Sequence, residues 1–109
     1  MTVSELQKAL PLTPVVLPEG EREVEGAYIG DLLSWVMGRA QSGNAWLTIM
    51  SNLNIVAVAT LSDVSCILLC EGVVPEDAVK ATAEAKGVNI LTTELTAYEA
   101  AKKLSELGL

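Results

Sequence analysis

The chain has 109 residues, half of them hydrophobic, which is enough for one globular domain that buries its core without disulfides or metals. It carries 14 acidic and 7 basic residues, and the resulting net charge of −7 disfavours binding to nucleic acid or to an anionic membrane. Polar residues within positions 1–10 argue against a signal peptide, so we expect a cytoplasmic protein.

The N-terminal quarter of the chain predicts little regular structure beyond one short helix. Thr2 and Glu5 have the spacing of a capping box, which predicts a helix over residues 3–10. Three prolines follow, so residues 15–17 between them can form a short edge strand at best. The acidic stretch 19–25 predicts a turn and a short extended piece.

A helix and a buried strand are predicted next. Asp31 is a favourable N-cap, and apolar residues follow it at helical spacing. These apolar residues are Leu32, Leu33, Val36, Met37 and Ala40. Gly43 and Asn44 end this region, and residues 45–50 have the β-branched and aromatic composition of a buried strand.

The long apolar run 54–70 needs a different interpretation. Asp63 lies near its middle, and a charge there opposes insertion in a membrane by about 2.5–3.5 kcal/mol. Residues 53–61 fit a strand or a helix on propensity. If the strands before and after them are parallel, a crossover must join the two, so we predict a helix over 53–61 and a strand over 66–70.

The two cysteines, Cys66 and Cys70, lie on this predicted strand. Four strand steps separate them by about 13 Å, which is too far for a disulfide. With Leu68 they share one face, where small buried thiols suit a reducing compartment. The chain contains no histidine, so we expect no metal site.

The last third of the chain has clear boundaries. Pro75 and the acids after it predict the start of a helix that ends before Gly87. Residues 88–91 predict a short strand. Thr96 begins a second capping box, which predicts a helix to about residue 107.

Strands and helices therefore alternate over residues 45–107, which predicts a small three-layer α/β domain with a mainly parallel sheet flanked by helices. In such sheets ligands bind beyond the carboxyl ends of the strands. The segments at that edge supply the candidate ligand-binding residues Ser51, Asn52, Cys70, Glu71, Gly72, Thr92 and Thr93.

The sequence offers little for catalysis. Without histidine, the usual general base and every Ser–His or Cys–His pair are missing, and neither glycine-rich phosphate-binding motif occurs. Glu71 and Glu94 could approach each other, but surface acids are more often solvated charges. Cys70 has no neighbouring base to lower its pKa, so a structural thiol is favoured. For Trp35 and Trp46 we favour core packing.

Three stretches of the chain resemble the DRTGG domain family and together cover almost its whole length. They are "TVSELQKALPLTPVV", "GAYIGDLLSWVMGRAQSGNAWLTIMSNLNIVAVATLSDVSCILLCEG" and "GVNILTTELTAYEAAKKL". The resemblance is to small stand-alone members, similar to the N-terminal domain of bacterial HPr serine kinase. The same fold occurs as an accessory domain in some phosphotransacetylases and in CBS-domain pyrophosphatases. The resemblance implies a regulatory or dimerisation module.

The family signature is only partly retained. Its Asp-Arg pair falls at Ser51 and Asn52, and its Thr-Gly-Gly falls at Cys70, Glu71 and Gly72, so that only the last glycine is kept. The arginine is lost, and the Glu71 carboxylate would repel phosphate. An anion site implied by the family is therefore not expected in its original form.

We interpret residues 1–109 as a single DRTGG-like domain that is not an enzyme and needs no cofactor. It would self-associate as a homodimer, through the 53–61 helix or the neighbouring strand ends, and bind a partner protein. Stand-alone members encoded near hydrogenase and redox proteins of anaerobic bacteria suggest one class of partner. The alternative is a sensor of a small, nucleotide-like ligand that binds at the carboxyl ends of the strands.

Overall fold

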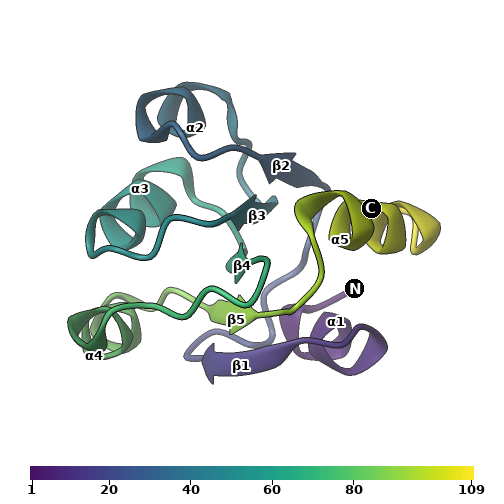
Figure 1. Ribbon diagram of the computed structural model, residues 1–109, viewed down its shortest axis with the longest axis horizontal. Coiled ribbons are helices and arrows are strands. Elements are labelled where there is room, and N and C mark those ends of the chain that lie inside the picture. Colours follow the sequence, from purple (N-terminus) through teal and green to yellow (C-terminus); the bar gives the residue numbers. More distant parts are fainter.

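The structure, a computed structural model, describes residues 1–109 as a five-stranded sheet between two layers of helices (Figure 1). The strands are β1 (Thr13–Val16), β2 (Ala27–Ile29), β3 (Ala45–Thr48), β4 (Cys66–Leu69) and β5 (Ile90–Thr92). The helices are α1 (Val3–Ala9), α2 (Leu33–Arg39), α3 (Asn54–Ser62), α4 (Asp77–Lys86) and α5 (Ala97–Glu106). This confirms the predicted fold class. No helix is both long and apolar enough to cross a membrane.

The sheet has the order β1-β5-β4-β3-β2, in which the last four strands are parallel and β1 is antiparallel to β5. The parallel strands follow one another across the sheet in chain order. Crossovers of one hand that all advance in the same direction place their helices on one face. Accordingly α2, α3 and α4 cover one face, while α1 and α5 cover the other (Figure 1).

Two hydrophobic cores form because the central strands are buried on both faces. Alternate residues point to opposite sides of a strand, so Ile67 and Leu69 pack under α2, α3 and α4. Cys66, Leu68 and Cys70 pack under α1 and α5, which confirms that the two cysteines share one face.

The predicted helices agree with the structure to within one or two residues, and both capping boxes are present. The predicted strand 88–91 begins two residues later, at Ile90. Strand β2 was missed, because its three residues are not fully buried on either face and give no pattern. It is nevertheless the parallel edge strand beside β3.

The predicted cap of α2 is wrong. Asp31 does not cap the helix: the N-cap is Leu32, without a side-chain hydrogen bond. Instead the Asp31 carboxylate accepts hydrogen bonds from the Thr48 hydroxyl (2.8 Å) and the Ile49 amide (3.0 Å), since the chain leaves β2 beside the end of β3.

The tryptophans also differ from each other. Trp46 is fully buried, as predicted, and its indole N–H donates to the Gly30 carbonyl at 2.9 Å. Trp35 was predicted in the core but is 52% exposed, because only Val36 of α2 is completely buried. The Arg39 guanidinium lies over the Trp35 ring, 3.6 Å from its centroid.

Candidate functional site

The chain diverges at the carboxyl ends of β4 and β5. After β4 it continues to α4 on one face of the sheet, and after β5 it continues to α5 on the other (Figure 1). In open α/β sheets, the point where successive connections leave for opposite faces is where a crevice forms and ligands bind. The edge between β4 and β5 is therefore the place to look for a site.

A tight turn closes this edge. Glu71 (φ 60°) and Gly72 (φ 74°) both have left-handed backbone conformations, and the Cys70 carbonyl accepts from the Val73 amide at 3.2 Å. Two successive positive φ values are typical of a type I′ turn. Glycine adopts this conformation freely, but a residue with a Cβ, such as Glu71, is destabilised there by about 1–2 kcal/mol.

Main-chain hydrogen bonds hold the turn against the segment after β5. The Glu71 amide donates to the Leu95 carbonyl at 2.8 Å, and the Gly72 amide donates to the Thr93 carbonyl at 2.9 Å. The Thr93 amide in turn donates to the Leu69 carbonyl at 2.9 Å. The crevice between β4 and β5 is thus bridged by backbone, and the turn is rigidly placed.

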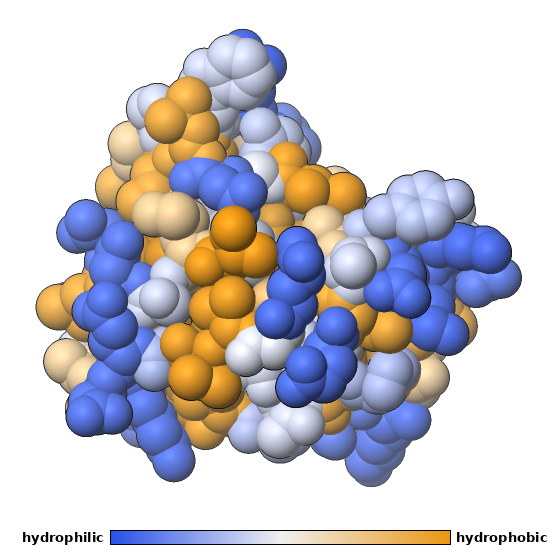
Figure 2. Space-filling view, viewed as in Figure 1, coloured by the Kyte–Doolittle hydropathy of each residue, from blue (hydrophilic) through white to orange (hydrophobic).

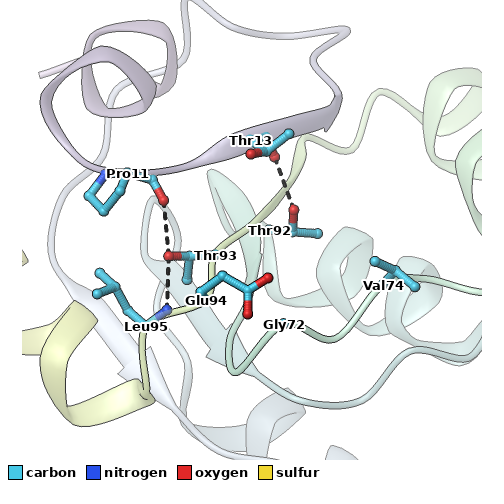
Figure 3. Close-up of a pocket in the computed structure, with 8 residues that line it drawn as sticks. All are labelled: Pro11, Thr13, Gly72, Val74, Thr92, Thr93, Glu94 and Leu95. Atoms are coloured by element: carbon cyan, nitrogen blue, oxygen red, sulfur yellow. Dashed lines mark hydrogen bonds between the residues drawn. The ribbon is translucent and has the colours of Figure 1, made fainter.

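A cavity of about 200 Å³ lies beside the turn (Figure 3). It is lined by Pro11, Thr13, Gly72, Val74, Thr92, Thr93, Glu94 and Leu95. The Thr93 hydroxyl donates to the Pro11 carbonyl (3.0 Å) and accepts from the Leu95 amide (3.2 Å), and the Thr92 hydroxyl donates to the Thr13 carbonyl (3.4 Å). Both hydroxyls are therefore occupied within the chain.

The Glu94 carboxylate lies against Gly72, so closely that a Cβ at position 72 would be 2.7 Å from its Oε2 (Figure 3). No lysine, arginine or histidine lines the cavity, and Glu94 is its only charged residue. The cavity therefore offers carboxylate and carbonyl acceptors, which suit a cation or a donor-rich group better than a phosphate. No three metal-ligating side chains come together anywhere in the structure.

The structure brings only part of the predicted set to this cavity. Gly72, Thr92 and Thr93 line it, whereas the other four candidates do not. The Ser51 carbonyl accepts from the Glu76 amide at 3.1 Å, and the Asn52 side-chain oxygen accepts from the Asn54 amide at 2.9 Å. These two residues therefore shape the starts of α4 and α3.

Sequence reasoning missed Pro11 and Thr13, which reach the cavity because β1 pairs with β5. The prolines marked an edge strand correctly, but no local signal tells which edge it joins. Glu94 was noted only as an acid that could approach Glu71, whereas its position over Gly72 follows from the turn geometry.

The two free thiols are buried, as predicted. Burial raises the pKa of Cys66 to about 12. Burial, aided by the negative charges of Glu71 and Asp31, raises the pKa of Cys70 to about 11. Both side chains therefore remain protonated at neutral pH and are poor nucleophiles.

Comparison with known proteins points to one family. The DRTGG domain matches residues 19–107 of the chain. A solved structure, the CBS and DRTGG domains of the regulatory region of Clostridium perfringens pyrophosphatase complexed with its activator diadenosine tetraphosphate, has the same fold with a TM-score of 0.71 and 15% identity. The match covers 94% of this chain and 45% of that one, so the chain spans less than half the length of its structural neighbour. No curated protein sequence matches the chain.

Proposed function

Because the chain belongs to the DRTGG domain family, which is a family of regulatory domains, we propose that it acts without catalysis, by self-association and by binding a partner protein. The free, buried thiols suit the reducing cytoplasm, where we place it. Redox or hydrogenase proteins of anaerobic bacteria are the first partners to seek by co-purification.

The outer face of α3 carries the proposal of self-association. The helix lies between α2 and α4 (Figure 1), and its exposed residues, with Leu53 before it, recur at helical spacing and so form one stripe. The stripe consists of Leu53, Asn54, Ala57, Thr60 and Leu61. Leu61 is 75% exposed, and a groove of about 520 Å³ runs from this stripe to Thr82 and Lys86 of α4.

The α3 stripe suits a second copy of the chain because it is uncharged. No residue of α3 is ionisable. In a two-fold dimer each residue of a patch meets the same patch on the other subunit, so a charged patch would repel itself and an uncharged one does not. A stable interface needs roughly 800 Å² from each partner. The stripe and its groove would be the centre of such an area.

Sedimentation equilibrium tests this proposal directly. We expect a mass of twice the 11.5 kDa chain at micromolar concentration. A monomer over the whole concentration range would contradict self-association.

The absence of catalysis is tested separately: the purified chain should neither hydrolyse ATP nor phosphorylate a protein. Turnover above that of a Cys70→Ala, Glu71→Ala double variant would contradict the non-catalytic assignment.

A second candidate function is that of a nucleotide-like ligand sensor. It is favoured by the ligand of the structural neighbour and by the cavity at Gly72, Thr92 and Thr93. It is opposed by the Glu94 carboxylate, which would face the phosphates. Titration with diadenosine tetraphosphate, followed by calorimetry, separates the two functions, because we expect no heat of binding from the wild-type chain.

A further inference from the structure

The carboxyl ends of the strands carry exposed apolar side chains. We define the carboxyl rim as residues 29–32, 49–52, 70–76 and 93–96, the segments that leave β2, β3, β4 and β5. Its large exposed hydrophobic residues are Ile29, Leu32, Ile49 and Val74. Ile29 is 50% exposed and Val74 is 70% exposed. Seen as in Figure 1, hydrophobic side chains gather over the segments that leave β3 and β4 (Figure 2).

The same rim is uniformly acidic. Asp31, Glu71, Glu76 and Glu94 are all exposed there, while each of the seven lysines and arginines of the chain lies outside the rim. The rim thus combines apolar contact area with unopposed negative charge. Figure 2 shows hydrophilic side chains bordering the hydrophobic ones on this face.

The charge decides which occupant fits the rim. A second copy packed across a two-fold axis would bring four acids of each chain against four of the other, and like charges across an interface cost several kcal/mol. Nucleic acid and anionic membranes are repelled for the same reason. A segment with apolar side chains flanked by lysine or arginine satisfies both features of the rim.

We propose that the carboxyl rim is the docking surface for a partner protein through a basic, apolar segment. This inference rests on the proposed partner-binding function and names the chemistry of the partner. The turn at Glu71 supports it, because it holds one carboxylate at the rim in a left-handed conformation at an energetic cost. The two hydrogen bonds to the segment after β5 fix this turn, so the acidic surface needs little ordering on binding.

The test uses the full chain and a labelled amphipathic peptide with one leucine face and one lysine face. Fluorescence anisotropy measures its binding to the wild type and to two double variants of equal net charge. Glu71→Gln with Glu94→Gln removes acids from the rim, whereas Glu84→Gln with Glu106→Gln removes acids near the far ends of α4 and α5. We expect the rim pair to weaken binding at least about tenfold and the distant pair to leave it within about twofold.

Apolar contacts are tested in the same way. Ile49→Ser with Val74→Ser should weaken binding of the peptide, while Leu107→Ser, an exposed apolar position outside the rim, should not. No binding by the wild type, or equal weakening by rim and distant variants, would overturn the proposal. If the Ile49→Ser, Val74→Ser pair abolishes self-association instead, the rim holds a second copy, which also overturns it. A monomeric wild type that still binds the peptide would contradict only the proposed dimer.

Discussion

The two ends of the sheet differ in which side chains they leave exposed. At the amino end, the residue directly before each of β3, β4 and β5 is a buried polar one: Asn44, Ser65 and Asn89. At the carboxyl end, Ile49 directly follows β3 and is exposed, and Val74 lies exposed in the segment after β4. Both ends bury polar side chains, including Thr48 and Thr93 at the carboxyl end, but the carboxyl end also leaves apolar side chains exposed beside the sheet.

The buried polar residues tie the acidic stretch 19–25 to the sheet. Asn44 donates to the Glu25 carbonyl (3.3 Å), and the Ser65 hydroxyl contacts the Glu23 carbonyl. Asn89 binds Glu19 through both the amide and the carbonyl of that residue. The buried side chains of Asn44, Ser65 and Asn89 all find hydrogen-bond partners within the chain, so these three residues serve stability. The carboxyl end has contact area left to share, so we assign binding to it.

The largest expected effect is at the amino end. The Asn89 side chain accepts from the Glu19 amide (2.9 Å) and donates to the carbonyls of Glu19 (2.8 Å) and Ser65 (2.9 Å), and the residue is 1% exposed. Asn89→Ala leaves these buried groups unpaired, so we expect a loss of about 2–4 kcal/mol in the free energy of unfolding. Urea denaturation followed by circular dichroism measures it.

The matched control is an asparagine at the carboxyl end. Asn52 makes one side-chain hydrogen bond, to the Asn54 amide, and is half-buried. Asn52→Ala should therefore cost only about 0.5–1 kcal/mol. Equal losses for the two variants would contradict the assignment of stability to the amino end.

The next effect separates the two exposed apolar surfaces. Leu61→Asp places a charge in the α3 stripe, and we expect it to weaken self-association by at least about 2 kcal/mol, or roughly 30-fold. Ile49→Asp adds the same charge to the carboxyl rim and should leave self-association unchanged. Sedimentation velocity over a dilution series compares them. The reverse result would place the second copy at the rim.

A smaller effect, a gain in the free energy of unfolding, is expected from a substitution in the turn after β4. Glycine at position 71 would adopt φ 60° without the steric penalty of a Cβ, although it also raises the conformational entropy of the unfolded chain. We expect Glu71→Gly to raise the free energy of unfolding by about 0.5–1 kcal/mol. Glu71→Ala removes the same charge but keeps the Cβ, so it should give no such gain. A gain from alanine would assign the cost of Glu71 to charge repulsion rather than to backbone strain.

Sequence reasoning succeeded where the signal is local. The capping boxes at Thr2 and Thr96 fixed two helices, because a side chain and an amide three residues apart make the hydrogen bonds. The central strands were identified because burial on both faces requires an unbroken apolar run. The crossover argument chose a helix for residues 53–61 correctly.

Sequence reasoning failed where an element depends on contacts with residues far away in the chain. Strand β2 and the exposure of Trp35 follow from lying at the edge of the sheet, which no short pattern encodes. The cavity at the carboxyl end needs β1 beside β5, a contact between residues about 80 positions apart, as between Thr13 and Thr92. Of the eight residues that line this cavity, the sequence therefore named only three as candidates, Gly72, Thr92 and Thr93.

The smallest expected effect tests the ion pair between Arg22 and Asp63 at the amino end. The Asp63 carboxylate accepts from the Ser42 hydroxyl (2.5 Å) and pairs with Arg22 (2.8 Å), and these contacts lower its pKa below the ordinary value of 3.8. A carboxyl whose pKa is lower in the folded state stabilises the fold above its unfolded-state pKa. That contribution is lost as the pH falls through the folded-state value.

Asp63→Asn should therefore destabilise the chain at neutral pH and become equal to the wild type in strong acid. Asparagine tolerates the left-handed conformation of this residue, so backbone strain does not confuse the comparison. Because the carboxylate is largely exposed, solvent screening keeps the difference below about 1 kcal/mol. Urea denaturation of both proteins across the acid range measures this difference in the free energy of unfolding.

Ser42→Ala should reduce the pH dependence of the wild-type stability, since the Ser42 hydroxyl makes the largest contribution to the lowered pKa of Asp63. A difference that stays constant with pH would mean that Asp63 acts through its shape and not through its charge.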